Sequence, residues 1–132
     1  MSEYESKKRL KKYGISVAEE FVVTSADEAK EAVNKINIPF AMKVCSADIL
    51  HKSDVGGVIL NVSDSEMARA SFTTIMKNVK KNCPEANVEG VLVAPMLKKG
   101  MEMIIGVNND PQFGPMLMVG MGGVFVEIYK DI

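Results

Sequence analysis

The chain has 132 residues, of which 47% are hydrophobic and 25% are charged, as in an ordinary globular domain that buries a core. Its 16 basic and 17 acidic residues nearly cancel, which argues against nucleic acid or an anionic membrane as a partner. No apolar run approaches the length that spans a bilayer, and no signal peptide opens the sequence. We therefore expect a cytoplasmic protein.

Capping and turn residues divide the first half of the chain into helices and strands. Ser2 and Glu5, and again Ser25 and Glu28, have the spacing of a capping box, which begins a helix. Gly14 stands where a helix stop is expected. The elements predicted in chain order are a helix to about residue 12, a strand over 20–23, a helix to about residue 36, a strand over 40–44, a loop over 45–57 and a strand over 58–62.

The second half is predicted to be mostly β-structure after one long helix. Ser63 or Ser65 can cap that helix, which is predicted to end near residue 82. Pro95 cannot donate a ladder hydrogen bond, so the next strand bends or ends there. Residues 108–111 form a strong turn signal. The strands predicted here cover residues 88–97, 101–107, 116–119 and 124–129.

One stretch, residues 51–58, carries the most chemical information. His51 is the only histidine of the chain, and it precedes Gly56 and Gly57 between two predicted strands. An imidazole titrates near neutrality and is a nucleophile when neutral. Adjacent glycines let backbone N–H groups approach an anion, to which Lys52 adds a positive charge. The pattern suggests phosphoryl chemistry, whereas a surface histidine in a glycine turn is the plainer alternative.

Other polar residues indicate which kinds of functional site the chain can form. Lys43 lies inside an apolar predicted strand, which is costly unless its ammonium finds an anion or reaches water. Cys45 and Cys83 lack metal-ligand spacing with each other or with His51. We therefore expect reduced thiols and no metal site in this chain. The basic run in the first helix is interpreted as a solvated face.

Many ordered blocks of residues resemble the ATP-grasp domain of ADP-forming acyl-CoA synthetases, above all ADP-forming acetyl-CoA synthetase. The blocks are residues 42–44, 48–58, 100–102, 105–107, 110–115, 120–123 and 126–131. The resemblance implies an α+β ATP-grasp fold. Residues 1–97 would form a complete amino-terminal subdomain with the phosphohistidine loop and the hinge. Residues 98–132 would supply the first strands of the second subdomain, which we expect to be truncated at its carboxyl end.

The resemblance also implies a phosphoryl relay. In this family, acyl-CoA, phosphate and ADP are interconverted with carboxylate, CoA and ATP, and a histidine of the CoA-binding part takes the phosphoryl group. In the archaeal enzymes a second histidine, in the ATP-grasp part, relays it to the nucleotide. His51 stands at the position that resembles this second carrier, so it is the predicted catalytic residue. Asp48 or Asp54 could orient its ring or could simply cap a turn.

Nucleotide contacts are implied from several elements. Lys43 resembles the strand lysine that contacts nucleotide phosphates. Residues 93–97 resemble the hinge whose backbone recognises adenine, although Pro95 excludes a donor at its own position. Glu102 could contact the ribose, support the hinge or face solvent. The predicted nucleotide-binding residues are Lys43, Lys52, Gly56, Gly57, Val58, Ala94, Met96 and Glu102.

The predicted function is therefore the nucleotide-binding module of an ADP-forming acetate–CoA ligase, an acid–thiol ligase that we expect to be inactive as an isolated chain. ATP or ADP would bind together with Mg²⁺, whose ligands are expected outside this chain. The expected partner is a CoA-binding synthetase subunit or domain, and we expect an oligomer. Two alternatives stay open: the ATP-grasp part of a synthetase-like protein acetyltransferase, and a truncated nucleotide-binding or assembly module without turnover.

Overall fold

A computed structural model describes residues 1–98 and 100–122. The chain divides into two compact units, Met1–Met96 and Leu97–Ile132. The strand predicted over residues 124–129 lies outside the described residues. Within the described ranges, no helix combines the length and the apolar character that a membrane crossing requires.

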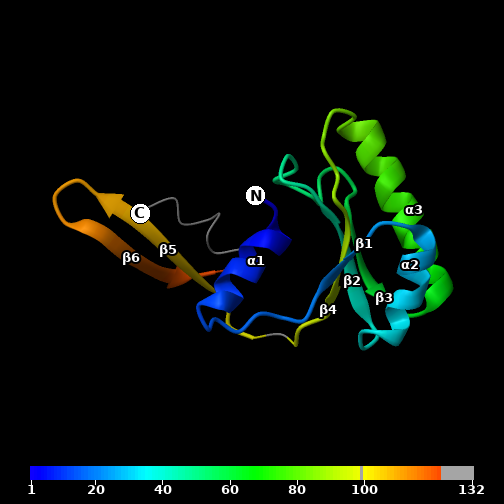
Figure 1. The fold of residues 1–132 in the computed structure, drawn as a ribbon, viewed down its shortest axis with the longest axis horizontal. Coiled ribbons are helices and arrows are strands. Elements are labelled where there is room, and N and C mark those ends of the chain that lie inside the picture. Colours follow the sequence, from blue (N-terminus) through cyan, green and yellow to red (C-terminus); the bar gives the residue numbers. More distant parts are fainter. Residues whose placement is uncertain (99, 123–132) are drawn as a thin grey trace. The chain divides into compact units, whose positions relative to one another are not determined.

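The first unit is built on a four-stranded antiparallel sheet (Figure 1). The strands lie in the order β1-β4-β2-β3, so the last strand in the sequence occupies a central place. That place explains why β4 is almost wholly apolar and buried. The strands are β1 (Phe21–Val23), β2 (Phe40–Cys45), β3 (Val58–Val62) and β4 (Gly90–Pro95). The sequence predicted all four, but β4 is shorter than the predicted 88–97 and ends at Pro95.

The core lies on one face of this sheet. Phe40, Met42 and Val44 alternate along β2 and belong to one buried cluster with Val91 and Val93 of β4. Alternate residues of a strand share a face, so this is the face toward α2 and α3. The helices that cover it are α2 (Ala26–Lys30), which continues into the 3-10 helix η1 (Glu31–Asn34), and α3 (Ser65–Asn82) (Figure 1).

Two helix predictions need correction. The helix predicted to residue 36 is a short α-helix that tightens into η1. Its capping box is also incomplete: Ser25 accepts from the Glu28 N–H at 3.1 Å, but the Glu28 carboxylate accepts from the Thr24 N–H at 2.6 Å. The long helix ends at Asn82 as predicted, but its cap is Asp64, whose Oδ1 accepts from the Met67 N–H at 2.8 Å.

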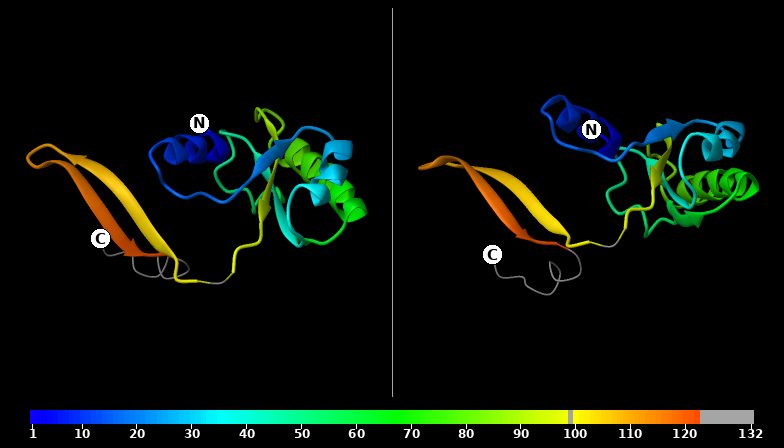
Figure 2. Two further views of the ribbon diagram at one scale, coloured as in Figure 1. Left: turned by 60° about the horizontal axis from the view of Figure 1, so that its bottom comes forward. Right: turned by 90° about the horizontal axis from the view of Figure 1, so that it is seen from below.

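The helix α1 (Glu3–Lys12) lies on the other side of the sheet from α2 and α3 (Figures 1 and 2). Its predicted capping box is confirmed, with Ser2 as the cap and Glu5 reaching back. The helix ends before Gly14, which adopts a positive φ of 79°. A side-chain hydrogen bond from Ser2 Oγ to Glu89 Oε2, at 3.2 Å, ties its beginning to the residue before β4.

The second unit is described as a hairpin of β5 (Met103–Asp110) and β6 (Gly114–Met121). The turn predicted over residues 108–111 lies further along, because Asn108 and Asn109 pair with β6. Asp110 makes the turn instead, since its Oδ1 accepts from the N–H groups of Gln112 and Phe113 at 2.8 and 3.0 Å.

Candidate functional site

The segment between β2 and β3, residues 46–57, carries His51. Lys43 pairs with Val58 across the two strands, so the ends of the segment meet. Gly57 makes this close approach possible, because a Cβ there would lie 2.7 Å from Val44 Cγ1 and 2.9 Å from the Lys52 carbonyl oxygen. The N–H of Gly57 donates to that same carbonyl at 2.8 Å.

Polar side chains hold both ends of this segment. Ser46 Oγ donates to the Asn87 carbonyl at 2.7 Å, and the Asn87 N–H donates to Asp48 Oδ2 at 2.8 Å. Two side-chain amides of α3 donate to carbonyls at the other end: Asn78 to Gly56 at 3.0 Å and Asn82 to Val55 at 3.1 Å. The tip of the segment, where Leu50 and His51 are exposed, lies between these anchored ends.

His51 lines an open pocket of about 430 Å³ on the first unit. The pocket is lined by Glu3, Lys43, Leu50, His51, Lys52, Ser53, Asp54 and Val58. Lys43 comes from β2 and Glu3 from the first turn of α1, so the amino-terminal helix meets β2 and the segment that follows it here. Because His51 is exposed, its ring is open to a reactant from solvent.

A chain of ion pairs leads from this pocket along α1 to Glu20. Lys52 Nζ lies 3.5 Å from Glu3 Oε2. The other oxygen of Glu3 lies 2.8 Å from Lys7 Nζ, and Lys7 also pairs with Glu20 at 2.8 Å. Lys52 and Lys43 are therefore the two cations in the pocket wall, with Glu3 as a carboxylate beside them.

The surroundings shift the ionisation of this network. Burial acts to raise the pKa of Glu3, but its hydrogen bond and ion pair with Lys7 and the charges of Lys43 and Lys52 outweigh burial and lower it. Burial acts to lower the pKa of Lys7, but its bonds to Glu20 and Glu3 prevail and raise it. Glu3 and Lys7 therefore both stay charged near neutral pH.

Part of the predicted site is assembled in the pocket. The predicted residues that line it are Lys43, His51, Lys52 and Val58. Gly56 and Gly57 do not line it, and their N–H groups donate to the carbonyls of Ser53 and Lys52 at 3.0 and 2.8 Å. A phosphate cradle made by these two N–H groups stays a prediction, and forming it requires both bonds to be given up.

The predicted hinge residues lie elsewhere. Ala94 pairs with Ala41, and Leu92 pairs with Lys43, so Ala94 shares a face of the sheet with Lys43. Ala94 is buried and Met96 is exposed, and neither lines the pocket. Glu102 belongs to the second unit. Nucleotide contacts from these three residues stay predictions.

The two aspartates that could orient His51 separate in the structure. Asp48 accepts the Asn87 N–H and so fixes the segment to the loop before β4. Asp54 lines the pocket with His51. Of the two, Asp54 is therefore the carboxylate that shares a cavity with the imidazole.

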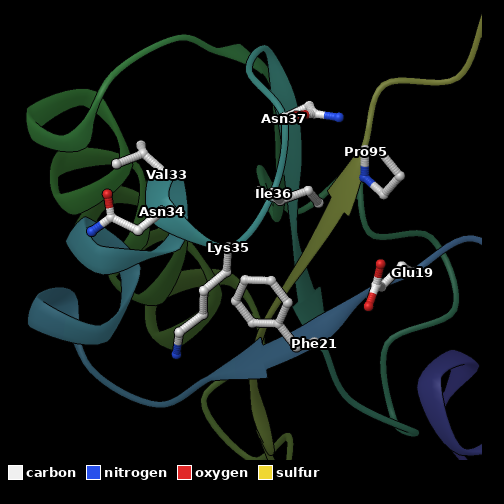
Figure 3. Close-up of a pocket in the computed structure, with 8 residues that line it drawn as sticks. All are labelled: Glu19, Phe21, Val33, Asn34, Lys35, Ile36, Asn37 and Pro95. Atoms are coloured by element: carbon white, nitrogen blue, oxygen red, sulfur yellow. The ribbon is translucent and has the colours of Figure 1, made fainter.

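A second pocket, of about 370 Å³, lies at the β1 edge of the sheet. Figure 3 shows Phe21 beside Lys35, with Glu19 and Pro95 on the opposite side. The Lys35 Nζ lies 5.7 Å from the centre of the Phe21 ring, within the range of a cation–π contact. Of the predicted hinge, this pocket is lined only by Pro95, and it contains neither His51 nor the predicted lysines, so the His51 pocket is the candidate site.

The described residues fit a phosphate group better than a metal ion. Within residues 1–98 and 100–122, no three His, Cys, Asp or Glu side chains form a group that could hold a metal. The described residues therefore form no cage of three such ligands around a metal ion. Lys43 and Lys52 instead supply ammonium groups of the kind that bind phosphate in proteins. Cys45 and Cys83 are free thiols.

Sequence reasoning missed Glu3 as a pocket residue. The capping box correctly placed the start of α1, but nothing in the pattern showed that this helix end packs beside residues about 50 positions later. The only signal was the acidic first turn of the helix, which a favourable interaction with the helix dipole already explains.

Known proteins resemble the whole chain. A family model described as the ATP-grasp domain matches residues 1–132. The beta subunit of acetate–CoA ligase [ADP-forming] II from Pyrococcus furiosus is 49% identical over 132 residues, which are all of this chain and 56% of that subunit. The chain thus spans little more than half of this curated relative.

Solved structures show the same likeness. Acetyl-coenzyme A synthetase 1 of Ca. Korarchaeum cryptofilum, in complex with coenzyme A, Ca-AMPCP and HgCl+, matches with a TM-score of 0.91 and 43% identity over 99% of this chain and 57% of that one. A structure of that enzyme with Mg-AMPPCP, whose phosphohistidine segment points towards the nucleotide binding site, matches with a TM-score of 0.77 at 37% identity, over 98% of this chain and 55% of that one. The fold and the match over all 132 residues show that this chain belongs to the ATP-grasp domain family.

Proposed function

We propose that this chain is the nucleotide-side part of an ADP-forming acyl-CoA synthetase of the acetate–CoA ligase type. In this proposal His51 carries a phosphoryl group to ADP. One observation supports it most: His51 is exposed at the tip of an anchored segment and shares one pocket with Lys43 and Lys52. A nucleophile and two ammonium groups around one cavity are suited to phosphoryl transfer.

Loading of the carrier is the first chemical step. The donor is a phosphohistidine on the acyl side of the enzyme. A ring nitrogen of neutral His51 attacks its phosphorus, and a new P–N bond forms while the donor's P–N bond breaks. The electron pair of that bond returns to the donor imidazole. One ring proton passes through solvent from His51 to the donor ring, so charge and atoms balance.

Transfer to the nucleotide is the second step. An oxygen of the terminal phosphate of ADP attacks the phosphorus on His51, a P–O bond forms and the P–N bond breaks. The imidazole recovers one proton from solvent, and ATP leaves. Lys43 and Lys52 would offset the negative charge that gathers around the phosphoryl group.

The rest of the machinery would lie outside this chain. The relatives are longer, and this chain covers 56% of the Pyrococcus furiosus subunit. The ligands that complete a Mg²⁺ site, and the acyl-side histidine, would come from other domains or subunits. The CoA-binding part is therefore the partner that this proposal requires.

A chimera tests the carrier role. The chain replaces the matching residues of the Pyrococcus furiosus beta subunit, and the assembled enzyme is incubated with ATP that carries a radioactive terminal phosphate. We expect an acid-labile label on the chimera, because phosphoramidates hydrolyse in acid. Because His51 is exposed, His51→Ala should leave the fold intact, as circular dichroism can check.

The label in the His51→Ala chimera decides the question. Complete loss of label in a folded variant supports His51 as the carrier. A label that persists in the variant, or that is stable in acid, rules the carrier role out. Lys43→Met serves as a graded comparison, since it should slow labelling while leaving the labelled residue unchanged.

A further inference from the structure

Glu3 links the amino-terminal helix to the segment that carries His51. It is the first residue of α1, and it lines the pocket together with Lys43 and Lys52. One of its carboxylate oxygens lies 3.5 Å from Lys52 Nζ, and the other lies 2.8 Å from Lys7 Nζ. The phosphoryl relay described above does not use this carboxylate, so its place in the pocket points to a separate role.

The fold fixes the position of Glu3. The residue before it, Ser2, is only 2% exposed, and its Oγ donates to Glu89 Oε2 at 3.2 Å. The same oxygen accepts from the Glu5 N–H as the helix cap. Because the start of α1 is tied to the residue before β4, Glu3 presents its carboxylate at a defined place in the pocket.

Lys52 is the other end of this link. It is the residue next to His51, and its side chain is only 19% exposed in the ion pair with Glu3. The hydrogen bonds of Ser46, Asn78 and Asn82 hold the two ends of the segment. The Glu3 ion pair holds its tip, and it is therefore placed to restrain the neighbour of His51.

A phosphate group would need the same lysine. Lys43 and Lys52 are the cations in the pocket wall, and Lys52 is already paired with a carboxylate. A phosphate oxygen can bind Lys52 fully only after it displaces Glu3. Lys7, at 2.8 Å, stays beside Glu3 and neutralises it when Lys52 leaves. A competing internal anion lowers apparent affinity by the fraction of molecules in which it occupies the site.

We propose that Glu3 is a positioning residue for His51: it holds Lys52, and with it the tip of the segment, until a phosphate group displaces its carboxylate. This inference deepens the proposed carrier function and rests on it for its biological meaning. Its physical basis is the pair of contacts that Glu3 makes with Lys52 and with Lys7.

The only histidine of the chain makes a direct probe. NMR signals of the His51 ring in the 132-residue chain report on the pocket without ambiguity of assignment, and inorganic phosphate is the titrant. We expect Glu3→Gln to bind phosphate about two- to five-fold more tightly, because Lys52 no longer has to leave a carboxylate. Glu20→Gln is the matched control, since Glu20 contacts Lys7 but does not line the pocket.

Tryptic cleavage after Lys52 measures the restraint on the tip. Glu3→Gln and Lys52→Gln should both free the tip, so hydrogen exchange over residues 50–54 should quicken in both. Cleavage after Lys52 should quicken in Glu3→Gln, where the lysine is retained.

The two variants should move phosphate affinity in opposite directions, because Lys52→Gln removes a cation. This opposition separates a positioning role from general unfolding, which would weaken binding in both.

Two results would overturn the proposal. The first is wild-type phosphate affinity and wild-type exchange at the tip in folded Glu3→Gln. The second is an equal change in Glu20→Gln, which would assign the effect to the charges around Lys7 in general. Neither readout needs phosphoryl transfer. If the chimera shows that His51 carries no phosphoryl group while Glu3→Gln still shifts both readouts, the proposed function fails and the positioning role stands.

Discussion

In the first unit, Ile75 of α3 is fully buried, whereas in the second unit Ile105 of β5 is 70% exposed. The first unit buries a cluster of apolar side chains between its sheet and the helices that cover it. The described hairpin is a two-stranded ribbon whose apolar side chains are largely exposed, and an isolated ribbon of this kind is marginally stable in water. The His51 pocket lies on the unit that has its own core, and such support keeps functional groups in place.

Hydrogen exchange over the whole chain tests this contrast most strongly. Amides in β2 and β4 should exchange only on global unfolding, because these strands are central and buried. Amides in β5 and β6 should exchange roughly a thousand-fold faster. Equal protection in the two units would show that the hairpin is as stably packed as the core, and the contrast would be wrong.

A matched pair of isoleucines tests packing. Ile75→Ala should lower the free energy of unfolding by about 2–5 kcal/mol, because it leaves a cavity in the core. Ile105→Ala should change it by less than about 0.5 kcal/mol. Urea unfolding followed by circular dichroism measures both values. Similar losses in the two variants would contradict the described exposure of the hairpin.

A matched pair of glycines tests the base of the His51 segment. Gly57→Ala should destabilise the first unit by about 1–3 kcal/mol, because the added Cβ meets Val44 and the Lys52 carbonyl. It should also shift the His51 ring signals. Gly120→Ala in the hairpin meets nothing within 4 Å and should be nearly neutral. A neutral Gly57→Ala would mean that the segment does not close as described.

Acid should affect the two units through different carboxylates. The lowered pKa of Glu3 contributes stability that is present above its unfolded value of 4.5 and is lost as pH falls through the folded value. We expect this contribution to be less than about 1 kcal/mol. In the hairpin, N–H groups of Phe113 and Gln112 lower the pKa of Asp110 from 3.8, with the same sign.

Urea midpoints at pH 7 and pH 3 check this prediction. Glu3→Gln should reduce the loss of stability between the two pH values, since glutamine cannot be protonated in this range. Asp110→Asn should leave the global midpoint almost unchanged and should alter only exchange in the hairpin. A Glu3→Gln variant with the full wild-type loss would show that this carboxylate does not contribute.

Local signals in the sequence were sufficient for most elements of the first unit, although the helix predicted to residue 36 is a short α-helix followed by η1. Capping residues and apolar periodicity predicted α1, the four strands and the end of α3. They failed where neighbouring candidates compete: Asp64, not Ser63 or Ser65, caps α3, because its carboxylate reaches the Met67 N–H. The hairpin turn lies later in the chain than predicted, because Asn108 and Asn109 pair with β6 as part of β5.

In the candidate site, too, some contacts could be predicted from the sequence and others could not. The meeting of Lys43 and His51 could be predicted, because β2 and β3 flank the segment in the sequence. The contribution of Glu3 could not, since it depends on where α1 packs against the start of β4. The hydrogen bonds that the Gly56 and Gly57 N–H groups donate could not be predicted from the sequence either, because they depend on how the segment itself folds.

Phosphorus NMR of the chimera tests the central claim most directly. The chimera is first phosphorylated on His51, and ADP is then added with Mg²⁺. The proposed role predicts that the phosphohistidine resonance disappears while the resonances of ATP appear in equal amount. A phosphohistidine signal that survives ADP, or that decays only to inorganic phosphate, would contradict the claim that His51 passes phosphorus to the nucleotide.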